Sequence, residues 1–322
     1  MDRMTTNYRH NLPQLKGGAF LTDGGMETTL IFHEGADLPH FASFVLLATQ
    51  EGRQQTAAYY RRYLEIAARH GSGFILDTPT WRANADWGAK LGYSTEALRA
   101  ANDDAIELLT ELRAHYQRPG APIVISGTIG PRGDGYKAGR MTADEAEAYH
   151  AEQIESFAGT DADMVTAFTL TNVDEAIGIA RAAKRLAMPC AISFTVETDG
   201  KLITGGTLKQ AIEAVDAATG NYPHYYMINC AHPSHFAEAV DSGEDWLKRI
   251  GGIRANASMM SHAELDECET LDDGDPADLG RRYRELTRQM PHVRVLGGCC
   301  GTDHRHIAAI CEACLPETKL SA

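Results

Sequence analysis

Two adjacent cysteines, Cys299 and Cys300, stand in the run Gly-Gly-Cys-Cys-Gly at 297–301. Neighbouring cysteines rarely bridge each other, because the peptide between them strains the disulfide geometry. Flanking glycines allow the backbone to turn tightly and to approach a ligand closely. Two thiolates on such a turn suit a soft metal ion, and zinc is the first candidate. A third thiolate is then needed, and Cys230 in the run Met-Ile-Asn-Cys is the best candidate.

The other cysteines of the chain carry no comparable signal. There are seven cysteines in all: Cys190, Cys230, Cys268, Cys299, Cys300, Cys311 and Cys314. We expect Cys190 to lie in the core at the start of a strand and Cys268 to be a free thiol in an acidic loop. The CxxC pair Cys311 and Cys314 is expected to pack in a terminal helix. An odd set of cysteines without an export signal favours metal-bound or free thiols over a disulfide framework.

Length, charge and hydropathy limit the classes of protein that this chain could be. A chain of 322 residues with 43% hydrophobic residues fits a single large α/β barrel. A net charge of −14 excludes nucleic acid and anionic membrane as the main partner, since both need a basic surface. The N-terminus is polar, and no stretch approaches the roughly 20 apolar residues of a membrane span. We therefore expect a cytoplasmic protein.

Eight short β-type runs alternate with helical patterns along the chain. The expected strands are 19–23, 73–77, 123–127, 163–168, 190–195, 225–230, 252–256 and 293–298. Amphipathic helices are expected at 54–70, 144–158 and 174–186. Eight strand–helix alternations predict a parallel sheet closed into a (β/α)8 TIM barrel.

The barrel is expected to form a single domain at 18–315, with an N-terminal extension at 1–17 and a C-terminal tail at 316–322. No low-complexity linker or internal repeat divides it. The glycine-rich stretch 198–207 predicts an elaborated loop, and the acidic stretch 258–278 predicts another excursion from the barrel.

Polar or thiol side chains stand at the carboxyl ends of the expected strands, where barrels of this type form their sites. These residues are Asp23, Asp77, Thr78, Thr128, Phe168, Thr169, Thr195, Asn229, Cys230, Asn256, Cys299 and Cys300. The sixth strand carries Cys230 and the eighth carries Cys299 and Cys300. Because these strands are two apart around the barrel, we expect the three sulfurs to converge.

Three thiolates on zinc leave one of four tetrahedral positions open. A thiol bound there is deprotonated, and a thiolate is a strong nucleophile. The expected reaction is alkyl transfer to sulfur, with the alkyl donor held in line for displacement.

At this point the chain resembles the zinc-dependent homocysteine S-methyltransferase family. The matching runs are Leu21 to Thr28, Ser126 to Pro131, Ser193 to Thr195, Ile228 to Cys230, and Gly297 to Thr302 with His306 and Ile307. The resemblance implies a (β/α)8 barrel with catalytic zinc on Cys230, Cys299 and Cys300. It also implies methyl transfer to a thiol, usually homocysteine, which gives methionine. The expected donor is a sulfonium or quaternary ammonium compound, such as S-methylmethionine or a betaine, and a homo-oligomer stays open.

The chain departs from the family at two strand ends. Family members usually carry a Glu at the end of the fourth strand that helps hold the amino group of homocysteine, but Phe168 stands there. Asp23, the other acid associated with that amino group, is kept. At the seventh strand the family's aromatic-Pro-Asn run reads Arg254-Ala255-Asn256. Losing an acid would cost about 1–3 kcal/mol of affinity for an ammonium group.

Nine residues are the candidates for substrate binding. They are Asp23, Gly24, Gly25, Asp77, Trp81, Thr128, Phe168, Asn229 and Asn256. Asp23 is also the candidate catalytic residue, because it would orient the acceptor. Trp81 is expected to hold the methylated cation of the donor by cation–π attraction.

Three alternatives stay open. The same chemistry could serve a different thiol or selenol acceptor, because Phe168 replaces the family's Glu. The chain could be a methyl carrier that works with a separate corrinoid protein. It could also hold zinc or bind thiols without catalysis.

Overall fold

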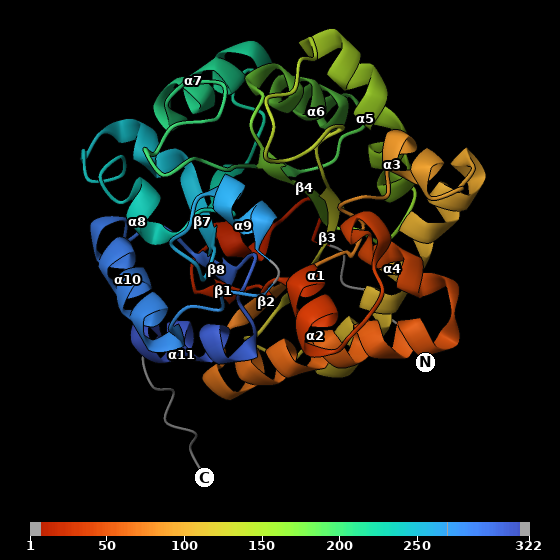
Figure 1. The fold of residues 1–322 in the computed structure, drawn as a ribbon, viewed down its shortest axis with the longest axis horizontal. Coiled ribbons are helices and arrows are strands. Elements are labelled where there is room, and N and C mark those ends of the chain that lie inside the picture. Colours follow the sequence, from red (N-terminus) through yellow and green to blue (C-terminus); the bar gives the residue numbers. More distant parts are fainter. Residues whose placement is uncertain (1–7, 269, 316–322) are drawn as a thin grey trace.

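The computed structural model describes residues 8–268 and 270–315. Eight parallel strands form a closed barrel in sequence order, surrounded by helices (Figure 1). The strands are β1 Phe20–Leu21, β2 Gly73–Asp77, β3 Ile123–Ile129, β4 Met164–Leu170, β5 Cys190–Phe194, β6 Tyr225–Asn229, β7 Ile250–Ala255 and β8 Val295–Gly298. The predicted (β/α)8 barrel is therefore confirmed.

Helices follow the strands, and most of them lie around the outside of the barrel, whereas α1 and α9 contribute residues to the cavity at its mouth. The α-helices are α1 Met26–Thr28, α2 Gln50–His70, α3 Ala85–Lys90, α4 Thr95–Tyr116, α5 Ala143–Ala158, α6 Val173–Arg185, α7 Leu208–Thr219, α8 Pro233–Phe236, α9 His262–Glu267, α10 Pro276–Gln289 and α11 His304–Cys314. Short 3-10 or π turns are η1 Pro13–Leu15, η2 Thr29–His33, η3 Pro39–Phe41, η4 Ser43–Ala48 and η5 Asp245–Arg249. Capping boxes at Thr142 and Thr207 fix the starts of α5 and α7.

All eight predicted strands exist, although their bounds differ. β2 has the predicted bounds, whereas β1 is only two residues long because the chain leaves the ladder before Gly24. The three named helices are confirmed as α2, α5 and α6, each within four residues of the predicted start.

The barrel interior is filled by side chains from alternate strand positions. They are Phe20, Ile75, Val124, Met164, Phe168, Ala191, Tyr225, Met227 and Val295. Leu12, which is buried, adds to this cluster from the N-terminal segment. The backbone N–H of Tyr8 donates to Asp163 Oδ1 at 2.6 Å, and Arg9 donates to the carbonyl of Ala162. The described part of the N-terminal extension thus packs against the amino end of the barrel, and residues 1–7 and the 316–322 tail lie outside the described residues.

The two predicted excursions lie beyond β5 and β7. The 198–207 loop contains one isolated bridge, between Lys201 and Thr207. The 258–278 stretch contains α9 and the start of α10, and it brings Asp266 to the mouth of the barrel. In the described ranges, no helix has both the length and the apolar character of a membrane span.

Candidate functional site

A cavity of about 530 Å³ opens at the carboxyl ends of the strands, where the barrel predicts a site. All but one of the predicted site residues line it. The lining includes Asp23, Gly24, Gly25, Asp77, Trp81, Thr128, Phe168, Asn229, Cys230, Cys299 and Cys300. The exception is Asn256, which is buried outside the lining and whose backbone N–H donates to the carbonyl of Ala231 at 3.1 Å.

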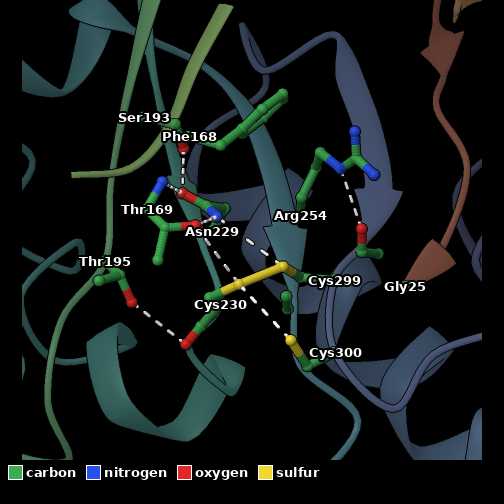
Figure 2. Close-up of a disulfide and its surroundings, with 12 residues drawn as sticks. Gly25, Phe168, Thr169, Ser193, Thr195, Asn229, Cys230, Arg254, Cys299 and Cys300 are labelled. Atoms are coloured by element: carbon green, nitrogen blue, oxygen red, sulfur yellow. Dashed lines mark hydrogen bonds between the residues drawn. A yellow bond between two sulfur atoms is a disulfide. The ribbon is translucent and has the colours of Figure 1, made fainter. Parts of the chain in front are cut away.

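The three predicted metal ligands converge at one side of this cavity (Figure 2). The Sγ atoms of Cys230, Cys299 and Cys300 all lie within 4.8 Å of one another. Cys230 and Cys299 form a disulfide, and Cys300 Sγ is 3.9 Å from Cys230 Sγ. The expectation of free or metal-bound thiols is therefore wrong for Cys230 and Cys299 in this structure. The physical reason is that the convergence that favours a metal also brings two Cα atoms to 5.3 Å, within the range of a bridge.

The donor set fits zinc once that disulfide is reduced. Four tetrahedral ligands at 2.3 Å from zinc lie about 3.8 Å apart, and the Cys230–Cys300 sulfur separation is 3.9 Å. Three sulfurs from two strand ends would occupy three positions around the metal, and the fourth position would face the cavity. Cys230, Cys299 and Cys300 are therefore the residues that would hold the metal.

Unusual backbone geometry presents these sulfurs. Cys230 has a φ of 52°, in the left-handed region that residues other than glycine rarely adopt. Its N–H donates to the carbonyl of Arg254 at 3.1 Å, which holds the turn after β6. A Cβ on Gly25 would lie 2.5 Å from the carbonyl oxygen of Cys299, so only glycine fits beside the paired cysteines.

Hydrogen-bond donors surround the sulfurs. Asn229 Nδ2 donates to Cys299 Sγ and Thr169 Oγ1 donates to Cys230 Sγ, each at 3.8 Å. Asn229 is held in place because its Oδ1 accepts from Ser193 Oγ at 2.6 Å. Such donors stabilise thiolates and fix the orientation of metal ligands. Sequence reasoning named Asn229 as a candidate binding residue, whereas it placed Thr169 at a strand end near the site without including it among the candidate binding residues.

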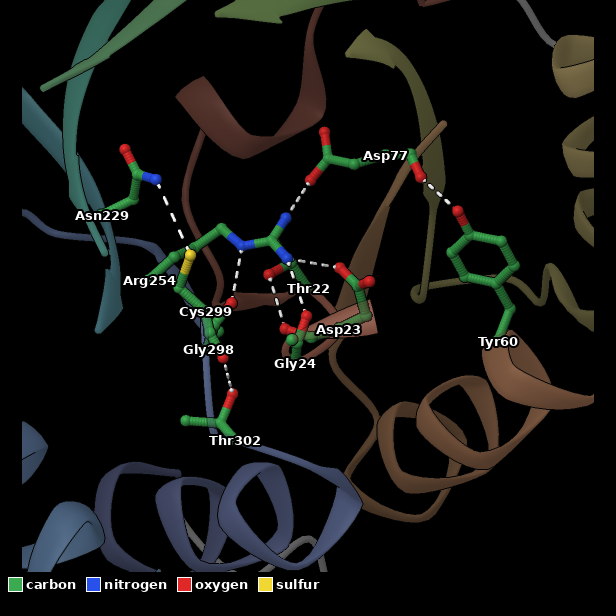
Figure 3. Close-up of polar contacts among 12 residues, drawn as sticks. Thr22, Asp23, Gly24, Tyr60, Asp77, Asn229, Arg254, Gly298, Cys299 and Thr302 are labelled. Atoms are coloured by element: carbon green, nitrogen blue, oxygen red, sulfur yellow. Dashed lines mark hydrogen bonds and ion pairs between the residues drawn. The ribbon is translucent and has the colours of Figure 1, made fainter. Parts of the chain in front are cut away.

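Arg254 crosses the floor of the cavity and joins two buried carboxylates (Figure 3). Its Nη2 lies 2.7 Å from Asp23 Oδ1, and its Nη1 lies 2.7 Å from Asp77 Oδ2. Nε donates to the carbonyl of Gly298 at 2.9 Å. The guanidinium also lies 4.9 Å from the centre of the Phe168 ring. Sequence reasoning missed this cluster, because it treated Arg254 only as a departure from the family's aromatic residue.

Burial and the ion pairs shift the pKa values of this cluster in opposite directions. Burial raises the pKa of Asp77 to about 7, although the Arg254 charge opposes the shift. Burial also raises the pKa of Asp23, again against Arg254 and a hydrogen bond from Tyr59. Burial lowers the pKa of Arg254, but the two carboxylates outweigh it and the net shift is upward. Arg254 is therefore a permanent cation, and burial favours the protonated form of both carboxyl groups beside it.

Trp81 forms part of the cavity wall. Its Nε1 donates to the carbonyl of Phe168 at 3.4 Å. The Arg82 guanidinium lies 4.0 Å from the Trp81 ring and 3.8 Å from the Trp87 ring. A cation from the protein thus already contacts Trp81, and the donor contact stays a prediction.

The remaining cysteines lie where the sequence indicated. Cys190 begins β5 and is buried, and Cys311 and Cys314 lie in α11. Burial raises the pKa of Cys190 and of Cys311 to about 12, which keeps both thiols protonated. Cys268 is a free, partly exposed thiol.

Comparison with known proteins agrees with this architecture. The chain is 23% identical over 326 residues to homocysteine S-methyltransferase 2 of Arabidopsis thaliana, which covers 91% of this chain and 92% of that protein. Two crystal structures of the Escherichia coli homocysteine methyltransferase MmuM share its fold. The metallated form has a TM-score of 0.71 at 22% identity, covering 92% of this chain and 96% of the other. The oxidized form has a TM-score of 0.72 at 21% identity, covering 95% and 99%.

The strongest evidence for the family of this chain comes from a match to the sequence model of one family. The model of the homocysteine S-methyltransferase family matches residues 20–314, which is nearly the whole barrel. The resemblance carried by the cysteine runs at the sixth and eighth strands is thereby confirmed. This chain belongs to the homocysteine S-methyltransferase family and is a methyltransferase.

Proposed function

We propose that this enzyme moves a methyl group from a sulfonium or quaternary ammonium donor to the sulfur of a small thiol, with zinc as cofactor. The observation that carries the proposal is the convergence of Cys230, Cys299 and Cys300 at one side of the cavity. Homocysteine is the first acceptor to test, because the family model and the curated relatives name it. The expected product is then methionine, and the expected location is the cytoplasm.

The cysteines would bind zinc after the Cys230–Cys299 disulfide is reduced. Zinc supplies a Lewis acid that favours the thiolate form of the acceptor. Asn229 and Thr169 would orient the sulfurs through the hydrogen bonds that they already make.

The transfer itself is a displacement at the methyl carbon. The acceptor sulfur forms a bond to that carbon while its bond to the onium sulfur or nitrogen breaks. The bonding electrons leave with the donor, which becomes a neutral thioether or tertiary amine, and the acceptor's proton is released to water. The cavity walls hold the two substrates in line.

The charge of the cavity favours a cationic donor. Glu27, Asp134 and Asp266 line it together with Asp23 and Asp77, against two arginines. The five acids outnumber these two cations, so the cavity attracts positive charge. One curated relative, from Pongo abelii and 25% identical over 59% of this chain, is named S-methylmethionine–homocysteine S-methyltransferase. S-methylmethionine and betaine are the donors to compare first.

A panel of donors and acceptors tests the proposal. The reduced, zinc-loaded protein is incubated with S-methylmethionine or betaine and with homocysteine or other thiols and selenols, and methylated products are measured by mass spectrometry. We expect turnover without any added protein. Turnover only with a corrinoid protein would favour the carrier alternative. Bound zinc with no methylated product from any pair would favour a zinc-holding protein.

A further inference from the structure

Arg254 places a permanent cation where the family's acceptor would bring its own. We propose that Arg254 makes this site selective for acceptor thiols that lack an α-ammonium group. The inference rests on the proposed methylation of a thiol and specifies the class of that thiol. It is carried by three contacts of Arg254, with Asp23, Asp77 and Phe168.

The first contact satisfies the acid that the resemblance assigns to the acceptor's amino group. Asp23 Oδ1 lies 2.7 Å from Arg254 Nη2, and Asp23 Oδ2 accepts from Tyr59 Oη at 3.0 Å. The Asp23 side chain is 5% exposed. Both oxygens therefore have a partner from the protein, and the charge of the carboxylate is compensated. An incoming ammonium group would have to displace Arg254 from a buried ion pair.

The second contact involves the other buried acid of the cavity floor. Asp77 Oδ2 lies 2.7 Å from Arg254 Nη1. One guanidinium and two carboxylates carry a formal charge of −1, and this charge would attract a cation if Asp77 were fully ionised. Burial instead raises the pKa of Asp77 to about 7, so the acid is partly protonated near neutral pH. Partial protonation reduces the negative charge of the cluster, although the buried Asp77 Oδ1 has no hydrogen-bond partner among the described residues.

The third contact replaces the family's second acid by an apolar ring. Phe168 occupies the strand end where family members usually carry a Glu, and the Arg254 guanidinium lies 4.9 Å from its ring. Phe168 also lines the cavity. A Glu at this position would present a carboxylate to an ammonium group. The Phe168 ring presents only its face, and the Arg254 guanidinium already contacts that face.

These contacts determine which acceptor fits the floor. An ammonium group beside Asp23 would meet the like charge of Arg254 in a buried place, and both oxygens of the Asp23 carboxylate already have a partner from the protein. A thiol whose far end is neutral or carries only a carboxylate avoids that repulsion. The preferred acceptor is therefore a thiol without an α-ammonium group.

Homocysteine and 4-mercaptobutanoate form a matched pair, because they differ only in the α-amino group. Calorimetric titration of the reduced zinc protein with each thiol gives the two affinities. Both titrations are made at a pH at which the ionised fraction of each free thiol has been measured. Steady-state assays with one donor give the two kcat/KM values. We expect 4-mercaptobutanoate to bind at least tenfold more tightly and to have the higher kcat/KM. Equal or tighter binding of homocysteine would overturn the inference.

Two substitutions test whether Arg254 is the cause. Arg254→Met removes the cation and frees Asp23, so the preference should fall at least tenfold or reverse toward homocysteine. Arg254→Lys keeps the charge and should keep the preference. A preference that survives Arg254→Met would contradict the role of Arg254. If Arg254→Met does not fold, the wild-type pair still decides the acceptor class.

The inference and the proposed function can fail separately. Tighter binding of 4-mercaptobutanoate with no methylation of either thiol would leave the acceptor class standing and overturn the methyl transfer. Methylation of homocysteine with a clear preference over 4-mercaptobutanoate would support the methyl transfer and overturn the proposed acceptor class.

Discussion

The phenol oxygen of Tyr136 lies 3.5 Å from the sulfur of Cys300. The Tyr136 ring, from the loop between β3 and α5, also packs at 4.5 Å against the ring of His262 in α9. His262 Nε2 in turn lies 2.6 Å from the carbonyl oxygen of Cys230. Two excursions of the barrel, far apart in sequence, thus hold the cysteine cluster from its outer side.

Tyr136→Phe should weaken zinc binding about tenfold while leaving the fold intact. The phenol can donate a hydrogen bond to the Cys300 thiolate, and losing such an outer contact typically costs 10–100-fold in metal affinity. Competition with a chromophoric chelator measures the affinity. Tyr116→Phe, on a half-buried tyrosine packed at the end of α4, is the control and should match the wild type. An unchanged affinity in Tyr136→Phe would show that the contact does not support the metal.

Cys230→Ser and Cys300→Ser should each lose stoichiometric zinc and nearly all methyl transfer, because a hydroxyl is a poor ligand for a site of soft sulfurs. Zinc is counted by atomic emission after reduction and dialysis. Cys268→Ser removes a free thiol outside the cluster and should keep both zinc and activity. Full zinc and full activity in the two cluster variants would refute the metal site.

Trp81→Ala should raise the donor KM about fivefold with a smaller change in kcat. The estimate corresponds to a cation–π contact of about 1 kcal/mol between the indole and the donor's methylated cation. Initial rates across donor concentrations measure it, at saturating acceptor. Trp246→Phe, on a partly buried tryptophan that does not line the cavity, is the control. A donor KM that stays at the wild-type value would exclude Trp81 from donor binding.

Asp303→Asn should lower stability at neutral pH, and the loss should shrink in acid. Burial raises the pKa of Asp303, but hydrogen bonds from His306 and Arg305 outweigh it and hold the pKa well below the usual value. A depressed folded pKa contributes stability that is present above the unfolded pKa of about 3.9 and is lost progressively as pH falls from there through the lower folded pKa. Asn keeps the cap of α11, so we expect a loss of about 1 kcal/mol from the missing charge.

Urea unfolding at pH 7, 5 and 3.5 measures the difference in free energy of unfolding between Asp303→Asn and the wild type. Asp199→Asn, at an exposed carboxylate in a surface pair, should show almost no difference at any of the three values. A loss for Asp303→Asn that is equally large at pH 3.5 and pH 7 would show that the carboxylate's charge is not its source.

The cysteine cluster was predictable because its signal is local. Glycines beside Cys299 and Cys300 indicate a tight turn, and the alternation of strands and helices places that turn two strands from Cys230. The disulfide between Cys230 and Cys299 was not predictable, because it depends on how closely two strand ends approach.

Arg254 was not predictable as the centre of the cavity floor for a related reason. Its carboxylate partners lie 177 and 231 residues away along the chain. A charged residue in a strand indicates that a partner of opposite charge is needed, but only the closed barrel shows which acids are that partner. Tyr136 lies in a loop without any periodic pattern, so no sequence feature indicated its contact with Cys300.

The position of Arg254 also bears on how such an enzyme could change over generations. The guanidinium links β7 to β2 and to the segment after β1, so it fastens the barrel as well as forming the cavity floor. Loss of the arginine alone would leave two buried acids facing each other, and loss of one acid would leave a buried cation unbalanced. A lineage that exchanged one acceptor for another would therefore have to replace Arg254 and its partners together, through intermediates less stable than either end point.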